Sequence, residues 1–350
     1  MKARAVAKNT INRVLEPFGA QVISRFEFDS VKRKLEKFLP AQLPAVPAVG
    51  LPQGASECLT ADNPRLMKLR SRYSDLDCPP IQHSLWTDSH ASLINLQCFR
   101  GDNPYVWQYQ DQNAEINYLL TAYYLRSIDK LGLLHRLKED GLFGALTFQF
   151  DENTVLSRDL LDSVSEITFL EETIEISKRE HLKVLDIGAG YGRFAHRLCE
   201  SLPLMDRAVC TDAVAESTFL SEYYLRFREV ADRSQVVPLD EIESFLDKNK
   251  IDLAVNIHSF SECAMSSIGW WLDLVCKHRV RYLFIVPNAG HDGGANLLIR
   301  EPGKPEPTDF MPEIFARGYR LIKKRAKYAK PVIQKYGVSP THYYLFELQA

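Results

Sequence analysis

Residues 181–198 read HLKVLDIGAGYGRFAHRL, with three glycines directly after a short apolar run. The run at 184–187 is apolar and rich in β-branched residues, which is typical of a buried strand, and Gly188 ends it. Beyond Gly192 the apolar residues recur at helical spacing as far as residue 202. The stretch therefore predicts a strand, a glycine turn and a helix, an arrangement that lets a ligand approach the backbone and the N–H groups at the helix start.

A second apolar run, 208–211, ends at Asp212, twenty residues beyond Gly192. Nucleotide-binding folds place an acid here to hold the ribose hydroxyls. The dinucleotide fingerprint has its third glycine one position later, where this chain has Arg193, and this departure disfavours NAD. The segment DIGAGYG instead resembles the GxGxG turn of class I methyltransferases, which bind S-adenosylmethionine (SAM). Glycines that serve packing alone are the alternative.

Alternating strands and helices continue from this turn to the C-terminus. The last two predicted strands have no clear helix between them, which suits the antiparallel edge of a class I methyltransferase sheet. The predicted fold is therefore α/β: a Rossmann-like class I methyltransferase sheet with an antiparallel C-terminal edge, preceded by a mostly helical N-terminal cap. The predicted strands are 184–187, 208–211, 235–238, 251–257, 281–286, 318–328 and 342–348.

A proline-rich stretch and changes in the apolar pattern along the chain predict three parts. These are an N-terminal extension with a proline-rich linker at 1–60, a helical cap or substrate region at 61–165, and a SAM-binding domain at 166–350. Within the cap, Gly132 breaks a pair of helices. In the helix predicted at 160–180, Ser163 and Glu166 have the spacing of a capping box.

The composition excludes several classes of protein. With 43 lysines and arginines against 45 aspartates and glutamates, the chain is close to neutral, so no nucleic-acid partner is predicted. The seven cysteines form no CxxC pair, which argues against a disulfide framework or a zinc site and fits a reducing cytoplasm. No segment is long and apolar enough for a membrane span. We therefore expect a cytoplasmic protein; whether it forms a homodimer stays open.

Several blocks outside the glycine turn resemble the sugar O-methyltransferase family of bacterial polysaccharide and glycoconjugate gene clusters. The resemblance covers most of the chain from about residue 60 onward. It implies SAM as cofactor, a hydroxyl of a sugar or glycoconjugate as acceptor, and a role in polysaccharide biosynthesis. The blocks are NPRLMKLRSRY, FRGDNPYVWQ, EDGLFGALTF, SRDLLDSVSEITFLE, VLDIGAGYGRFAHRL, SEYYLRF, IHSFSEC and FIVPN.

Candidate catalytic residues follow the fourth and fifth predicted sheet strands, because ligands of open α/β sheets bind beyond the carboxyl ends of the strands. His258 has the pKa range of a general base, with a hydrogen-bonding role at the rim as the alternative. Glu262 is a second candidate, although its spacing from Ser259 is that of a capping box.

His291 is a further candidate base, in a glycine-rich loop next to Asp292. The alternative is a divalent-metal site formed by these two residues together with His258 and Glu262. They lack the ligand spacing of known metal motifs, so no metal is predicted.

The cofactor residues are expected at the ends of the first four sheet strands. Asp186 would orient the glycine loop or the methionine amine, and Asp212 would take the ribose hydroxyls. Asp240 is placed either to reach the adenine or to cap a helix. The full predicted cofactor set is Asp186, Gly188, Ala189, Gly190, Gly192, Asp212, Asp240 and Asn256.

Two further segments allow a functional and a structural interpretation. Tyr105, Trp107 and Tyr109 form either a sugar-stacking wall or part of a core. The basic segment 323–330 either meets an anionic glycan or guards an edge strand with lysines. Two rival functions also remain: a methyltransferase for another small natural product, and a SAM-binding module without catalysis.

Overall fold

The computed structural model describes residues 50–82, 86–101, 114–290, 292–301, 304 and 306–349. Contacts divide the chain into two units, Met1–Ala48 and Val49–Ala350. All the described residues belong to the second unit. The predicted N-terminal extension, as far as residue 49, lies outside them.

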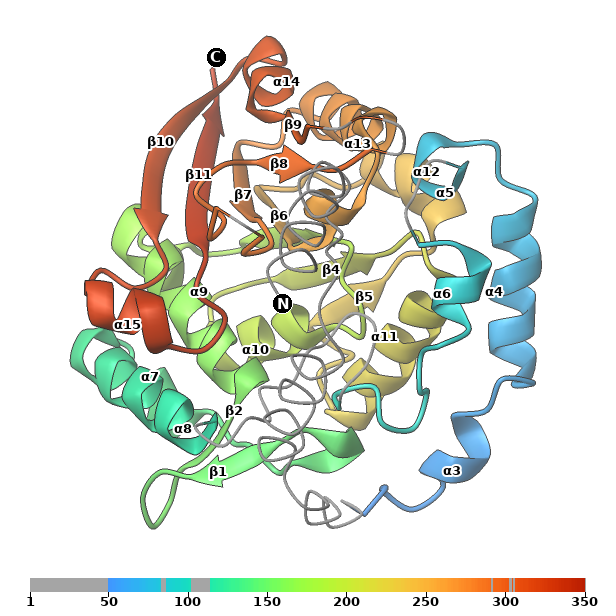
Figure 1. Ribbon diagram of the computed structural model, residues 1–350. Helices are drawn as coiled ribbons and strands as arrows, with labels where there is room; N and C mark the ends of the chain where they lie inside the picture. The colour runs from blue at the N-terminus through green and yellow to red at the C-terminus, as the bar shows by residue number, and fades with distance from the viewer. Residues whose placement is uncertain are drawn as a thin grey trace, which may run out of the picture. The chain divides into compact units, whose positions relative to one another are not determined.

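A seven-stranded mixed sheet forms the centre of this unit (Figure 1), in the order β10-β11-β7-β6-β3-β4-β5. The five strands from β3 to β7 are parallel, and β11 is antiparallel to both β7 and β10. The predicted class I methyltransferase sheet with an antiparallel C-terminal edge is confirmed, and each strand lies within two residues of its predicted bounds. The strands are β3 (Lys183–Ile187), β4 (Arg207–Thr211), β5 (Ser234–Val236), β6 (Leu253–Ile257), β7 (Tyr282–Val286), β10 (Tyr319–Ala326) and β11 (His342–Leu348).

Helices surround the sheet, and two short antiparallel pairs, β1 (Thr147–Gln149) with β2 (Val155–Ser157) and β8 (Leu298–Ile299) with β9 (Thr308–Asp309), lie outside it. Helices and 3-10 turns (η) are α3 (Ala55–Cys58), α4 (Pro64–Ser74), α5 (Pro79–Gln82), α6 (Asp88–Ala91), α7 (Ala114–Ile128), α8 (Leu133–Arg136), η2 (Leu142–Gly144), α9 (Arg158–Ile174), η3 (Ile176–Lys178), α10 (Arg193–Ser201), α11 (Ala215–Phe227), η4 (Leu239–Glu241), α12 (Ile242–Leu246), η5 (Ser259–Glu262), α13 (Met265–Lys277), α14 (Met311–Ala316) and α15 (Pro331–Tyr336).

The core lies on both faces of the sheet. Val184 packs in a buried cluster with α7, α9 and α10, whereas its neighbour Leu185 packs in a second cluster with α4, α11 and α13. Consecutive residues of a strand point to opposite faces, so a sheet that is covered on both sides needs continuous apolar strands. The five buried residues of β7, Tyr282–Val286, show this composition directly.

The order of the strands places the ligand-binding edge. From β3 the chain moves outward to β4 and β5 and then returns to β6, on the other side of β3. At such a switch point the loops that leave neighbouring strands diverge, which opens a crevice at their carboxyl ends. The loops after β3, β4 and β6 therefore face one common space.

The N-terminal cap, defined here as the described residues from α3 to β2, is mostly helical as predicted. Asn63 begins α4 by accepting a hydrogen bond from the Arg65 N–H, with Pro64 at the first helical position. Gly132, with a φ of 66°, separates α7 from α8, which confirms the predicted break. The β1–β2 hairpin was not predicted, since its strands are only three residues long.

The start of α9 corrects one prediction. Its N-cap is Ser157, whose hydroxyl accepts a hydrogen bond from the Leu160 N–H. Ser163 lies inside the helix and donates to the Asp159 carbonyl, so it forms no capping box with Glu166. The boundary predicted between 165 and 166 falls within this helix, whose buried residues belong to the same cluster as the sheet. The cap and the sheet therefore share a core.

No helix in the part of the chain that the structure describes has the length and apolarity needed to cross a bilayer.

Candidate active site

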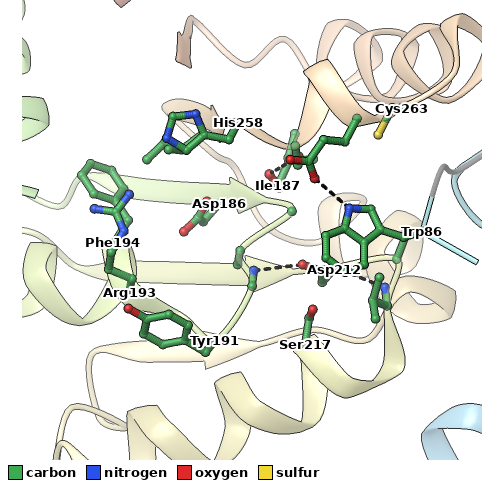
Figure 2. A pocket seen from close by; sticks show the side chains of 18 of the residues that line it. Trp86, Asp186, Ile187, Tyr191, Arg193, Phe194, Asp212, Ser217, His258 and Cys263 are labelled. Carbon is green, nitrogen blue, oxygen red and sulfur yellow. Dashed lines mark hydrogen bonds between the residues drawn. The ribbon is translucent and has the colours of Figure 1, made fainter. Parts of the chain in front are cut away.

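A pocket opens at the carboxyl ends of β3, β4 and β6 (Figure 2), where the strand order predicts a ligand crevice. The loops after these strands form its floor, and α9 and the N-terminal cap contribute to its walls. Its lining residues are Pro80, Trp86, Arg158, Asp159, Asp162, Asp186, Ile187, Gly188, Ala189, Gly190, Tyr191, Arg193, Phe194, Asp212, Ala213, Val214, Ser217, Ile257, His258, Ser259, Glu262, Cys263 and Trp271.

The three glycines of the turn have positive φ but different surroundings. Gly190, with a φ of 57°, lines the pocket, and a Cβ there would meet nothing within 4 Å. A Cβ on Gly188 would lie 2.1 Å from the Ser259 Oγ, so this glycine permits close packing of the loop after β6. A Cβ on Gly192 would meet Leu225 at 3.2 Å, and Gly192 does not line the pocket. The turn thus exposes Gly190 to a ligand, whereas Gly192, predicted as a cofactor residue, packs against α11.

Asp212 lies directly after β4 and braces the glycine turn. Its carboxylate accepts the Gly190 N–H at 2.9 Å and the Val214 N–H at 2.8 Å, one on each oxygen. Burial raises the pKa of this carboxyl to about 7, although the backbone N–H groups of Val214, Gly190 and Ala213 act to lower it. Each oxygen accepts one of these backbone bonds and so has a second lone pair for a ligand.

Asp186 occupies the end of β3 and also lines the pocket. Burial raises the pKa of its carboxyl to about 7, with the nearby Arg193 opposing the shift. Within the described residues no basic side chain forms an ion pair with Asp186, Asp212 or Glu262. The pocket lining therefore includes three carboxyl groups that no basic side chain of the described residues neutralises.

Besides Gly192, two other predicted cofactor residues do not line the pocket. Asp240 accepts hydrogen bonds from Arg72 at 2.5 and 2.8 Å, which ties the loop after β5 to α4. Asn256 is fully buried and donates to the Ile187 carbonyl at 2.9 Å and to the Ser259 Oγ at 2.5 Å. Asn256 thus joins the loops that follow β3 and β6, and its hydrogen bonds hold these two pocket-lining loops together.

His258 combines a strained backbone with an orphaned ring nitrogen. Its φ is 70°, which is rare outside glycine, and its N–H donates to the Val286 carbonyl at 2.7 Å. Its Nδ1 is buried without a hydrogen-bond partner among the described residues. Burial, assisted by Arg158 and Arg193, lowers the pKa of the imidazole to about 3. His258 is therefore a neutral histidine at the pocket wall, and its backbone conformation costs free energy.

Glu262 does not cap α13, which begins three residues later. Its two carboxylate oxygens accept hydrogen bonds from the Trp86 Nε1 at 2.7 Å and from the Asn288 Nδ2 at 2.8 Å. Burial raises the pKa of Glu262. The capping alternative is wrong, because long-range contacts take up the carboxylate.

Charged residues of α9 form another part of the pocket wall. Asp162 lines the pocket, and its carboxylate is hydrogen-bonded to Lys327 and lies 3.3 Å from the Arg158 Nε. Although burial acts to raise it, Lys327, Arg158 and Arg193 hold the pKa of Asp162 below its usual value. Lys323 and Lys324 are exposed on the edge strand as predicted, but Lys327 is 2% exposed. The basic segment is therefore only partly a solvated edge.

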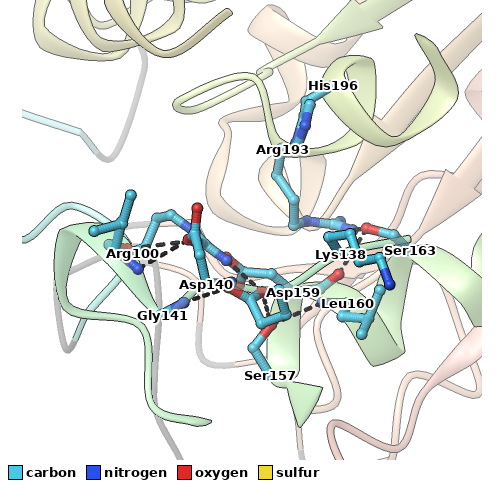
Figure 3. Close-up of polar contacts among 12 residues, drawn as sticks. Arg100, Lys138, Asp140, Gly141, Ser157, Asp159, Leu160, Ser163, Arg193 and His196 are labelled. Carbon is cyan, nitrogen blue, oxygen red and sulfur yellow. Dashed lines mark hydrogen bonds and ion pairs between the residues drawn. The ribbon is translucent and has the colours of Figure 1, made fainter. Parts of the chain in front are cut away.

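A buried ionic network fixes this wall (Figure 3). Arg193 donates to Glu166 at 2.8 and 3.1 Å and to the Ser163 Oγ at 2.7 Å. Arg100 in the cap donates to Asp159 at 2.9 Å, and Tyr191 of the glycine turn donates to the same carboxylate. Removing one partner of a buried ion pair leaves an uncompensated charge and is strongly destabilising. The network therefore holds α9, the cap and the glycine turn together.

Some predicted residues lie outside the described residues: His291, and the aromatic set Tyr105, Trp107 and Tyr109. Asp292 is described, and its carboxylate accepts hydrogen bonds from the Gly294 and Asn296 N–H groups. Over the described ranges no group of histidine, cysteine and acidic side chains is arranged to hold a metal ion.

No protein-family model matches the chain, and no curated protein matches its sequence. Among solved structures, it is similar to a SAM-dependent methyltransferase from Clostridium acetobutylicum, at 13% identity over 53% of this chain and 92% of that chain, with a TM-score of 0.38. It is also similar to magnesium protoporphyrin IX methyltransferase from Synechocystis with bound SAM, at 9% identity over 55% of this chain and 83% of that chain, with a TM-score of 0.37. Identities and TM-scores of this size assign neither a cofactor nor an acceptor to this chain.

Proposed function

We propose that this chain is a SAM-dependent O-methyltransferase that acts on a hydroxyl of a sugar or glycoconjugate. The observation that carries the proposal is the open space at Gly190, which lies in one pocket with Asp186 and Asp212. A glycine turn at the switch point of an open α/β sheet suits a nucleoside ligand. Three carboxyl groups without basic partners suit a nucleoside ligand that also carries a positive charge.

The chain's own residues fit SAM at two points. Asp212 would accept the ribose hydroxyls with the lone pairs that its two backbone bonds leave over. Asp186 would face the methionine ammonium, and a nearby cation would restore the charge that burial suppresses in this carboxyl. The backbone at Gly190 and Ala189 would pack directly against the ligand.

SAM would supply a methyl group on a sulfonium: the acceptor oxygen bonds to the methyl carbon in line as the C–S bond breaks, and S-adenosylhomocysteine leaves. The protein has to align the acceptor and exclude water, and His258 would take the hydroxyl proton. A weak base suffices, because the protonated ether that forms with the new C–O bond is a far stronger acid than the alcohol. The positive charge that the sulfonium loses is then regained on the imidazole, so the net charge of the pocket is unchanged.

The sugar half of the proposal is supported by the sequence blocks that resemble the sugar O-methyltransferase family. One of these blocks supplies Arg158 and Asp162, charged residues of the kind that hydrogen-bond sugar hydroxyls. A role in polysaccharide biosynthesis and a cytoplasmic location belong to the same proposal, and a homodimer stays a prediction.

An acceptor screen tests this function. With SAM labelled on the methyl group, we expect label to enter nucleotide sugars or oligosaccharides, and not amines, phenols or tRNA. The Asp212→Ala variant is the control, since it should lose transfer to every acceptor. Transfer only to non-sugar hydroxyls would overturn the sugar assignment. SAM binding without transfer to any acceptor would favour a non-catalytic module.

A further inference from the structure

Trp86 brings an aromatic ring from the N-terminal cap into the pocket (Figure 2). It lies between α5 and α6, whereas the floor of the pocket is made by the loops of the sheet. The hydrogen bond from its Nε1 to Glu262 spans 176 positions of the sequence. The cap therefore reaches the carboxyl edge of the sheet through this residue.

The contacts of Trp86 determine what the ring offers to a ligand. The indole has one hydrogen-bond donor, and Glu262 accepts from it at 2.7 Å. Asn288 donates to the other oxygen of Glu262 at 2.8 Å, so the carboxylate is held from both sides. The ring also meets the His90 ring edge-on, with centroids 6.5 Å apart. Because its N–H is engaged, the indole contributes apolar ring surface to the pocket lining rather than a hydrogen-bond donor.

Trp86 lies on the same side of the pocket as the proposed ribose-binding carboxylate. It lines the pocket together with Asp212 and the following Ala213 and Val214, and its partner Glu262 acts on the Asp212 carboxyl electrostatically. The base of a nucleoside is attached beside the ribose hydroxyls, so it must lie close to Asp212. We propose that Trp86, positioned by Glu262, stacks on the nucleobase of the bound cofactor. The inference rests on the proposed function.

The other aromatic residues of the pocket fit this role less well. Trp271 is 3% exposed and packs edge-to-face on Trp270 with ring centroids 4.7 Å apart. Tyr191 and Phe194 follow Asp186 along the glycine turn, and Tyr191 is hydrogen-bonded to Asp159. The flat face of a nucleobase beside Asp212 would therefore stack best on Trp86, which is partly buried.

The test compares two ligands that share the nucleoside, S-adenosylhomocysteine and methylthioadenosine, by calorimetry. Stacking on a base contributes roughly ten- to hundredfold to affinity. We expect Trp86→Ala to weaken both ligands by the same factor of roughly ten to a hundred, and Trp86→Phe, which keeps a ring face, to weaken them less. Asp186→Asn should weaken S-adenosylhomocysteine alone, because methylthioadenosine lacks the ammonium.

Leu93→Ala is the matched control in the cap, since Leu93 is 67% exposed and does not line the pocket; it should bind both ligands as the wild type does. Equal affinity of Trp86→Ala and wild type, or a loss confined to S-adenosylhomocysteine, would overturn the stacking role and leave the proposed function standing. A wild-type protein that binds neither ligand would overturn both. If Trp86→Ala does not fold, Trp86→Phe decides: S-adenosylhomocysteine should quench its tryptophan emission less than that of the wild type, and undiminished quenching contradicts the inference.

Glu262 is a positioning residue in this scheme, and conservative replacement tests that. Glutamine keeps an oxygen for the Trp86 N–H, and its amide can pair with a reoriented Asn288 side chain. Glu262→Gln should therefore keep methylthioadenosine affinity, whereas Glu262→Leu should lose it to the extent that Trp86→Ala does. Equal losses in both variants would mean that the carboxylate contacts the ligand itself.

Discussion

Replacing Gly190 by alanine should weaken S-adenosylhomocysteine binding by roughly a hundredfold or more, because the new Cβ enters the space where the cofactor meets the backbone. That space is open without a ligand, since no atom of the described residues lies within 4 Å of the Cβ position. The fold should survive, with a loss of about 1–2 kcal/mol in the free energy of unfolding from the left-handed backbone. Calorimetry and thermal melting measure the two effects separately.

Gly54→Ala is the matched control for backbone strain. Gly54 has a φ of 78°, a Cβ there would also meet nothing within 4 Å, and the residue does not line the pocket. It should lose a similar amount of stability and keep full affinity. If Gly190→Ala binds as tightly as Gly54→Ala, the backbone at Gly190 does not contact the cofactor.

His258→Ala should lower turnover by roughly 10² to 10⁴, with the affinity for S-adenosylhomocysteine nearly unchanged, because a general base acts only in the transition state. His258→Asn should show the same loss while tolerating the positive φ, so strain and catalysis are separable. A base is active when unprotonated. With its pKa lowered to about 3, His258 stays unprotonated as the pH falls through 6.5, so at saturating SAM its titration should not lower the wild-type rate in that range.

His291→Ala is the paired comparison. If it alone shows the loss, the base belongs to the loop after β7. If both variants lose activity and EDTA abolishes the wild-type rate, the two histidines are metal ligands. If neither matters, Glu262 or a residue of the cap takes the proton, and the acceptor does not lie beside His258.

The sheet was predictable because its signals are local. The strands β3 and β4 are short apolar runs that end at a glycine and at an acid, and Gly188 and Asp212 mark the two turns that bind ligands in such folds. Helix starts were less predictable, since Ser163 has capping-box spacing from Glu166 whereas Ser157 is followed by leucine at that spacing. Only packing shows that Ser157 begins α9.

The walls of the pocket were not predictable in the same way, because their partners are distant in the sequence. Glu262 has capping-box spacing from Ser259, yet it binds Trp86 from the cap. Lys327 belongs to a basic run that is typical of an edge strand, yet it is buried against Asp162. The available signal was a cluster of charges, RDLLD at 158–162, at the start of α9.

Binding of SAM and NAD to the wild-type protein tests the central claim most directly. We expect calorimetry to show S-adenosylhomocysteine and SAM binding in the micromolar range, about 8 kcal/mol, and no binding of NAD. The glycine turn at Gly190, the acid at Asp212 and the arginine at 193 in place of a dinucleotide glycine all support this outcome. Binding of NAD without binding of SAM would contradict it.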